Sequence, residues 1–191
     1  MNNEEQIALL TEQITKLWRK RIDLLNEIEI PTMEIEGVTF AFLNYTYGPN
    51  LGSFPSQYEG YMDILCYYDE KNRVLDFTKI NPEVLSDIER AEEIADIVVV
   101  APHWGTEYTT TQSSYQEEFA RQMTEAGADL IIGTHPHVIQ PVEWIDDTLV
   151  IYSLGNFISA QYQDANYNKM VGLMTNLEIH KKVKGEEKEI T

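Results

Sequence analysis

Two short apolar runs on either side of a helical segment constrain the fold of this chain more than any other feature. Residues 97–100 read IVVV and residues 130–132 read LII, which is typical of strands buried on both faces. A strand, a helix and a strand of these lengths form a βαβ unit, so we expect the two strands to be parallel neighbours in a layered α/β sandwich. The helical face between them comprises Tyr115, Phe119, Met123 and Ala126.

The ends of two helices are also marked in the sequence. Ser114 and Glu117 have the spacing of a capping box, and Gly127 stands where that helix would end. Asn81 and Pro82 predict the start of an earlier helix, with asparagine as the cap and proline at the first position. Its expected buried face comprises Val84, Leu85, Ile88, Ala91 and Ile94.

Further strands are expected on both sides of the βαβ unit. Residues 34–47 and 148–152 are rich in strand-forming side chains, and apolar residues alternate with more polar ones over 171–179. Residues 61–67 and 74–77 predict a short hairpin. A loop rich in Gly, Pro, Ser and Asn separates this hairpin from the first strand.

The first 30 residues predict an amphipathic helix that precedes an α/β domain over 31–191. Apolar side chains follow a seven-residue repeat over residues 4–28, and Arg21 interrupts it. Two interpretations remain open, a coiled coil that forms a homo-oligomer and a helix that lies on its own domain. The repeat comprises Ile7, Leu10, Ile14, Leu17, Leu24 and Ile28.

Composition excludes several classes of function. The formal net charge of −18 disfavours binding to nucleic acid or to an anionic membrane surface. We expect no membrane span, because no apolar run approaches about 20 residues. The acidic N-terminus predicts no signal peptide in this sequence. The single cysteine, Cys66, excludes an internal disulfide and a cysteine-based zinc site.

Three of the four histidines follow the two buried strands. His103 comes after the first strand, and His135 and His137 come after the second. Ligands of α/β sheets bind outside the carboxyl ends of the strands, so we expect the three imidazoles to meet there. Pro136 favours an extended His135, which would direct both neighbouring imidazoles to one side. Imidazole suits Zn, Mn, Fe and Ni, and the pattern therefore predicts a metal site at this edge.

Other residues near these histidines are candidates for catalysis or for binding a substrate. Glu107 could ligate the metal, orient His103 or be exposed, and Trp104 could line the pocket or belong to the core. Trp104, Gly105, Gly133 and Asn156 are the candidates for binding a substrate, and Gly133 also allows the chain to turn sharply before the two histidines. Asn156 lies in the turn SLGNF, which either faces the crevice or is purely structural. Glu107 and Asn156 are the catalytic candidates, and His180 is expected to be an ordinary surface residue.

Long motifs around these residues resemble the CapA family of capsule and poly-γ-glutamate biosynthesis proteins. They are VVVAPHWGTEY, AGADLIIGTHPHVIQPVEW and LVIYSLGNF, and GVTFAFLNYTYG is similar to a family strand. The resemblance covers about residues 35–180. It implies a relationship to calcineurin-like metallophosphoesterases, in which a two-metal site is built on an α/β sandwich. It also implies that His103, His135 and His137, the last two after Gly133, bind divalent ions such as Mn, Fe or Zn.

The sequence also departs from the family pattern. Family members begin with a Gly-Asp strand motif, followed by Asn-Leu-Glu and Asn-Asn-His, and these motifs do not precede His103 here. The TNLE at 175–178 lies too late to replace them. The resemblance therefore implies the C-terminal half of a metallophosphoesterase-like domain, as a fragment or as a short form.

Two main functions follow from the resemblance. The first is part of a metallophosphatase-like hydrolase in envelope polymer synthesis, with little or no activity from this chain alone. The second is a non-catalytic assembly factor that binds the polymer synthesis machinery. A single-metal esterase or amidase is a third alternative. The resemblance implies a location in the cell envelope, outside the cytoplasm.

Overall fold

The computed structural model describes residues 30–48, 62–69, 71–72, 74–160, 167–184 and 187–190, with side chains described as far as residue 182. The chain divides into two compact units, Met1–Ile30 and Pro31–Thr191. The amphipathic helix predicted over residues 4–28 lies outside the described residues. Its role in oligomerisation and the domain boundary at residue 30 stay predictions.

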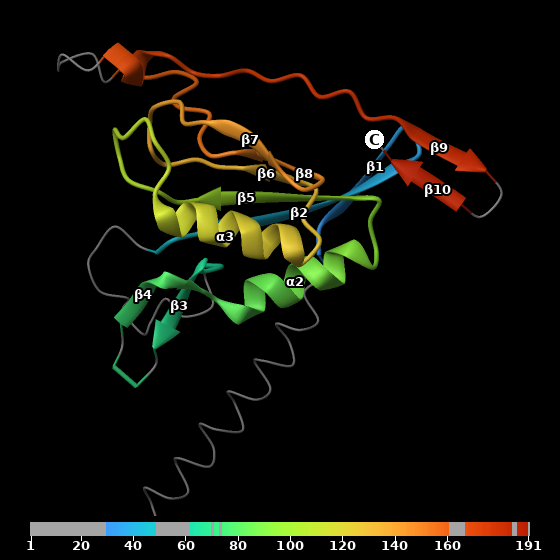
Figure 1. The fold of residues 1–191 in the computed structure, drawn as a ribbon, viewed down its shortest axis with the longest axis horizontal. Helices are drawn as coiled ribbons and strands as arrows, with labels where there is room; N and C mark the ends of the chain where they lie inside the picture. The colour runs from blue at the N-terminus through green and yellow to red at the C-terminus, as the bar shows by residue number, and fades with distance from the viewer. Residues whose placement is uncertain are drawn as a thin grey trace, which may run out of the picture. The chain divides into compact units, whose positions relative to one another are not determined.

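A mixed sheet of six strands forms the centre of the described structure (Figure 1). The inner four strands are parallel and the two edge strands are antiparallel to their neighbours. This arrangement confirms the predicted α/β class. In spatial order the strands are β1 (Thr32–Ile35), β2 (Val38–Thr46), β5 (Ile97–His103), β6 (Leu130–Ile132), β8 (Thr148–Ile151) and β7 (Val142–Ile145).

Two helices cover one face of this sheet. Helix α2 (Pro82–Glu92) precedes β5, and α3 (Ser114–Glu125) connects β5 to β6. Right-handed crossovers between parallel neighbours place both helices on the same face, and the two helices contact each other. Neither is long and apolar enough to cross a bilayer. Their buried side chains include Val84, Ile88 and Ala91 of α2 and Phe119, Ala120 and Met123 of α3.

Two small hairpins and a short helix complete the described elements. Strands β3 (Cys66–Asp69) and β4 (Val74–Ile80) pair antiparallel, which confirms the predicted hairpin with shifted bounds. Strands β9 (Lys181–Lys184) and β10 (Glu187–Ile190) form a second antiparallel pair. The 3-10 helix η2 (Tyr167–Met170) precedes an extended segment that leads to β9.

The N-terminal cap of α2 agrees with the prediction from sequence, whereas the cap of α3 differs from it. Asn81 caps α2 as predicted, and its side chain accepts a hydrogen bond from the backbone N–H of Glu83. The capping box of α3 is formed by Ser113 and Gln116, whereas Ser114 is already helical. The shift by one residue buries Gln116, so the predicted box of Ser114 and Glu117 is wrong.

Two predicted strands and one predicted core residue also differ. Residues 34–47 form a hairpin of β1 and β2, because Glu36 and Gly37 turn the chain with φ of 52° and 81°. Residues 173–180 pair in no ladder among the described residues, although their apolar side chains alternate. A strand needs a neighbour to bond its backbone groups, and the alternation alone does not supply one. Ile94 lies beyond the end of α2 and is 54% exposed.

The face of the sheet opposite α2 and α3 carries a continuous apolar row. Successive strands align Phe42 with Val99, Val99 with Leu130, Leu130 with Leu149, and Leu149 with Trp144. Paired residues of neighbouring strands point to the same face. Phe42 is 41% exposed and Trp144 is 67% exposed, so both ends of this row are open to solvent.

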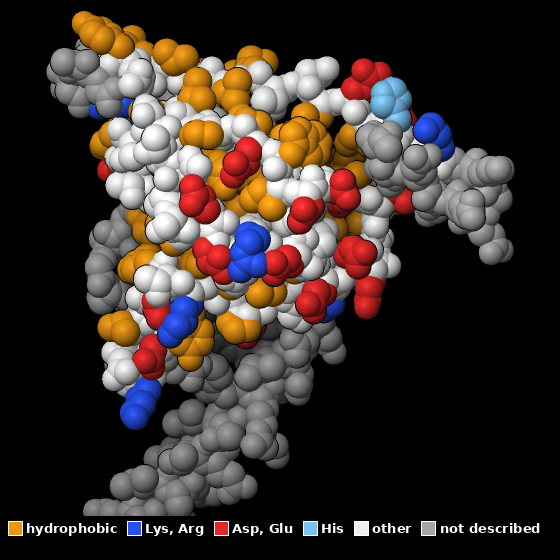
Figure 2. All heavy atoms as spheres, in the orientation of Figure 1, with side chains coloured by type: hydrophobic (Ala, Val, Ile, Leu, Met, Phe, Trp, Pro, Cys, Tyr) orange, Lys and Arg blue, Asp and Glu red, His pale blue; other side chains and the backbone are white. Residues whose placement is uncertain are grey.

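The helical side of the molecule has a different character. Figure 2 shows acidic side chains gathered over α2 and α3, with few basic side chains among them. On α3, Arg121 pairs with both Glu118 and Glu125. Exposed pairs of this kind contribute little to stability, typically about 0.2–1 kcal/mol. The helical side is therefore charged on its surface, whereas the opposite face of the sheet carries the apolar row.

Candidate metal centre

The ends of β5 and β6 bring two of the three histidines together. The N–H of Thr134 donates to the carbonyl of Pro102 over 3.0 Å, and the N–H of Trp104 donates to the carbonyl of Thr134 over 3.1 Å. These bonds continue the parallel pairing beyond the strands. As a result the ring centroids of His103 and His135 lie 4.6 Å apart.

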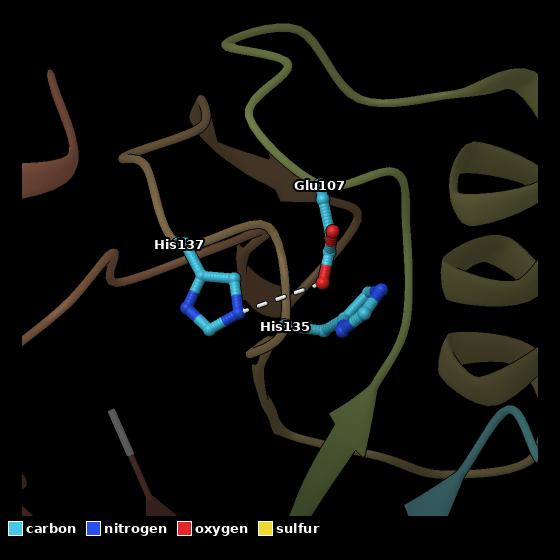
Figure 3. Close-up of side chains that lie close together, drawn as sticks. All are labelled: Glu107, His135 and His137. Atoms are coloured by element: carbon cyan, nitrogen blue, oxygen red, sulfur yellow. Dashed lines mark ion pairs between the residues drawn. The ribbon is translucent and has the colours of Figure 1, made fainter. Parts of the chain in front are cut away.

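The carboxylate of Glu107 lies close to both His135 and His137. Glu107, His135 and His137 each offer a ligand atom, and these atoms lie within 4.8 Å of one another. Figure 3 shows the Glu107 carboxylate pointing between the two imidazole rings. Its Oε1 lies 3.8 Å from Nε2 of His137. His103 is outside this group of three and adjoins it through His135.

The backbone of the histidine loop differs from the prediction. His135 and His137 have φ of 97° and 61°, so neither has the extended backbone that we expected around Pro136. Positive φ values are uncommon for residues other than glycine and strain the backbone. The carbonyl of Pro136 accepts a hydrogen bond of 2.8 Å from Tyr108, which itself has φ of 64°. The loop turns at both histidines, and contacts to the β5–α3 loop hold it there.

Two tyrosine rings line the histidines. Tyr47 stacks on His103 with a centroid distance of 5.9 Å and also lies 4.8 Å from His135. Tyr108 stacks on His137 at 5.7 Å. Tyr47 was not predicted as part of this site. Its position could have been inferred, because the register between β2 and β5 carries it to the same edge as His103.

The surroundings of His103 and His135 lower the pKa of both imidazoles. Burial lowers the pKa of His103, and the nearby His137 lowers it further. Burial is also the main cause that lowers the pKa of His135, followed by His103, while Glu107 acts in the opposite direction. Neutral imidazole is the form that binds metal ions, so this environment favours ligation.

Asn156 lies against the third histidine. Its Oδ1 is 2.8 Å from Nδ1 of His137, and its Nδ2 donates to the backbone carbonyl of Lys169 over 2.9 Å. Lys169 is buried, and its Nζ lies 4.6 Å from the centroid of the Tyr108 ring. No local pattern marks Lys169, since η2 follows the sheet strands in sequence and returns to this loop only in the folded chain.

Trp104, Gly105 and Gly133 have structural roles beneath the loop. Trp104 is fully buried, and its Nε1 donates to the carbonyl of Tyr152 over 3.0 Å. A Cβ atom at Gly133 would collide with that carbonyl and with Trp104. Gly105 has φ of 89° and donates its N–H to the hydroxyl of Tyr115. Contact of these residues with a substrate stays a prediction, and for the Trp104 side chain it would require the core to open.

The donor set suits a divalent transition metal. Two imidazoles and one carboxylate are ligands that Zn, Mn, Fe and Co accept in proteins, at about 2.0–2.2 Å for zinc. The separation of 3.8 Å between Glu107 and His137 exceeds a hydrogen bond and is short enough for both atoms to reach one ion. His180 pairs with Glu178 at 3.4 Å and is exposed, in agreement with a surface role.

Fold and site together define an α/β protein with a candidate metal cluster at the carboxyl ends of parallel strands. Residues 22–161 match the family model described as bacterial capsule synthesis protein PGA_cap. The chain therefore belongs to the PGA_cap family, which agrees with the resemblance drawn from its motifs.

Two curated relatives support this assignment. The chain is 36% identical over 134 residues to the PGA biosynthesis protein CapA of Bacillus subtilis (strain 168), covering 70% of this chain and 31% of the relative. It is 45% identical over 87 residues to the capsule biosynthesis protein CapA of Bacillus anthracis, covering 43% of this chain and 21% of the relative. The matched part is thus about a third or less of the length of either relative.

Proposed function

We propose that this chain acts in the synthesis of a capsule or poly-γ-glutamate envelope polymer and contributes one side of a metal site of phosphoesterase type. Its family and the names of its two Bacillus relatives support the biological role. The grouping of Glu107, His135 and His137 is the observation that supports the chemistry. The cell envelope is the proposed place of action, and the polymer synthesis machinery is the proposed partner.

Each residue of the cluster has a proposed role in metal binding. Glu107, His135 and His137 would hold a divalent ion, and His103 beside His135 would complete this site or begin a second one. A bound ion would supply Lewis acidity and lower the pKa of a coordinated water. The rings of Tyr47 and Tyr108 pack against the imidazoles and would help to keep them oriented.

Metal binding tests the chemical part of this proposal. We expect isothermal titration with Mn²⁺ or Zn²⁺ to show binding to the metal-free chain and a loss of at least about tenfold in affinity for His135→Ala. His180→Ala is the matched control, because His180 is an exposed histidine outside the cluster. Equal affinity of the wild type and His135→Ala would contradict the assigned ligands.

Catalysis tests the completeness of the site. We expect little or no phosphatase activity from this chain alone, because the Gly-Asp, Asn-Leu-Glu and Asn-Asn-His motifs of the family do not precede His103. A metal-loaded sample assayed with a chromogenic phosphate ester measures this activity. Robust turnover that is lost in His103→Ala would show that the ligands present suffice for hydrolysis.

A second candidate function is the non-catalytic docking of a partner, and the apolar row of the sheet favours it. The row from Phe42 to Trp144 lies on the sheet face that also carries His103. Val99 and His103 are four residues apart in β5, and side chains separated by an even number of residues point to the same face of a sheet. The proposed occupant is a β-sheet of a polypeptide equivalent to the part of the relatives outside the match. Two sheets that pack face to face bury such rows between them.

Co-expression followed by co-purification tests whether the chain docks a partner through the sheet face. We expect the chain to co-purify with the part of the Bacillus subtilis relative that lies outside the match, and Trp144→Glu to abolish the complex. Ile158→Glu is the control, because Ile158 is an 88% exposed apolar residue outside the sheet. Absence of a complex with the wild-type chain, or equal loss in both variants, would contradict docking on the sheet face.

A further inference from the structure

The amide of Asn156 has a defined orientation in the fold. Its Nδ2 donates to the backbone carbonyl of Lys169, which can only accept, and this bond identifies the nitrogen end of the amide. The oxygen end therefore faces His137, with 2.8 Å between Oδ1 and Nδ1. An amide oxygen only accepts hydrogen bonds, so Nδ1 of His137 must carry a proton to donate.

The proton on one ring nitrogen determines the state of the other. With its proton on Nδ1, a neutral His137 has a lone pair on Nε2, the nitrogen that lies 3.8 Å from Oε1 of Glu107. That lone pair can bind a metal ion between His137 and Glu107. In the opposite tautomer Nε2 would carry the proton and could bind no ion.

The backbone around Asn156 is closely packed. Gly155 has φ of 71° and forms a β-bridge with Gly172. A Cβ atom at Gly172 would collide with the carbonyl oxygen of Asn156, and one at Gly155 would lie 2.8 Å from the carbonyl oxygen of Val171. The two glycines therefore bring the chain after β8 close to the segment after η2, and the backbone of Asn156 lies against that segment. The hydrogen bonds to Lys169 and His137 then orient its side-chain amide.

We propose that Asn156 is a positioning residue, which holds His137 in the tautomer whose Nε2 lone pair faces Glu107. The inference rests on the proposed metal site for its purpose, while the tautomer itself is a property of the metal-free chain. Partners of this kind orient the histidine ligands of metal sites and typically change the affinity for the metal by about 10–100-fold. In this role Asn156 acts through His137 and touches neither metal nor substrate.

Long-range ¹H–¹⁵N spectra of the metal-free, ¹⁵N-labelled full chain test the inference, at a pH where histidine is neutral. We expect His137 in the wild type to carry its proton on Nδ1. In Asn156→Leu the acceptor is removed, and the Glu107 carboxylate then favours the proton on Nε2. In Asn156→Asp an acceptor remains, and we expect the wild-type tautomer. His180 serves as an internal reference whose signals stay unchanged.

A control variant and a separate metal titration distinguish failure of this inference from failure of the proposed function. Asn176→Leu is the matched control, since Asn176 is an exposed asparagine in the segment after Gly172, and we expect no change of tautomer. A proton on Nε2 of His137 in the wild type would overturn the inference without any variant. An unchanged tautomer in a folded Asn156→Leu would also overturn it. Titration with Zn²⁺ is the separate measurement, and a lack of binding with the expected tautomers would contradict only the proposed metal site.

Discussion

Gly133 and Gly37 show how two glycines can be required for different reasons. Gly133 precedes the histidine loop and is packed against the carbonyl of Tyr152 and the indole of Trp104, so no side chain fits there. Gly37 lies in the turn between β1 and β2, where φ is 81° and no atom would meet an added Cβ. Gly133 is required because tertiary packing leaves no space for a side chain, and Gly37 is required because the turn needs a positive φ.

Replacement of these glycines by alanine should therefore have unequal effects. We expect Gly133→Ala to lower the free energy of unfolding by about 1–3 kcal/mol, because the added methyl pushes away the Trp104 indole and the Tyr152 carbonyl. Gly37→Ala should cost about 1–2 kcal/mol, the strain of a left-handed alanine. Urea unfolding followed by tryptophan fluorescence measures both. An unchanged midpoint for Gly133→Ala would contradict the close packing under the loop.

Strand and helix positions were predicted better than their ends. The apolar runs of β5 and β6 and the periodicity of α2 and α3 extend over several residues, and their signal survives an error at one position. The cap of α3 depends on one residue, and both Ser113 and Ser114 are chemically suitable. Burial of Gln116 decides between them, because its side chain donates to Gln140 Oε1 inside the core.

The corrected cap can be tested on the helix itself. We expect Ser113→Ala to lower the free energy of unfolding by about 1 kcal/mol, because the hydroxyl no longer accepts from the N–H of Gln116. Ser114→Ala should change it little, since Ser114 is an exposed residue of the first turn. Chemical denaturation of the two variants beside the wild type measures this difference. A larger loss for Ser114→Ala would restore the box predicted from sequence.

The buried thiol couples the stability of the whole molecule to pH. Cys66 is completely buried in β3, and burial raises the pKa of its thiol to about 12, with a further increase from Asp76. Burial likewise raises the pKa of Tyr115 to about 12 and is the main cause that raises the pKa of Tyr45 and of Tyr152. The folded chain thus keeps these protons at a pH where the unfolded chain releases them.

We expect stability to fall as the pH rises. Below about pH 8.5, the ordinary pKa of a thiol, both states keep the proton of Cys66 and its contribution is complete. Above that pH only the unfolded chain loses the proton, so the free energy of unfolding falls by at most about 1.4 kcal/mol per pH unit. Urea titrations between about pH 8 and 9, below the range where unfolded tyrosines ionise, measure the slope due to Cys66. Cys66→Ala should remove most of it in this range, and an equal slope in that variant would contradict the assignment.

Local patterns in the sequence determined the α/β class, the βαβ unit, and the strand ends near which His103, His135 and His137 lie. These patterns depend on the spacing of side chains within one element, and that spacing is visible without the fold. Only the tertiary structure decided that Glu107 points between His135 and His137 and that Asn156 faces the latter. Both contacts join separate loops, and the distance between loops depends on how the whole sheet packs. The backbone strain at the two histidines has the same origin, since the surrounding loops impose a conformation that their own sequence does not favour.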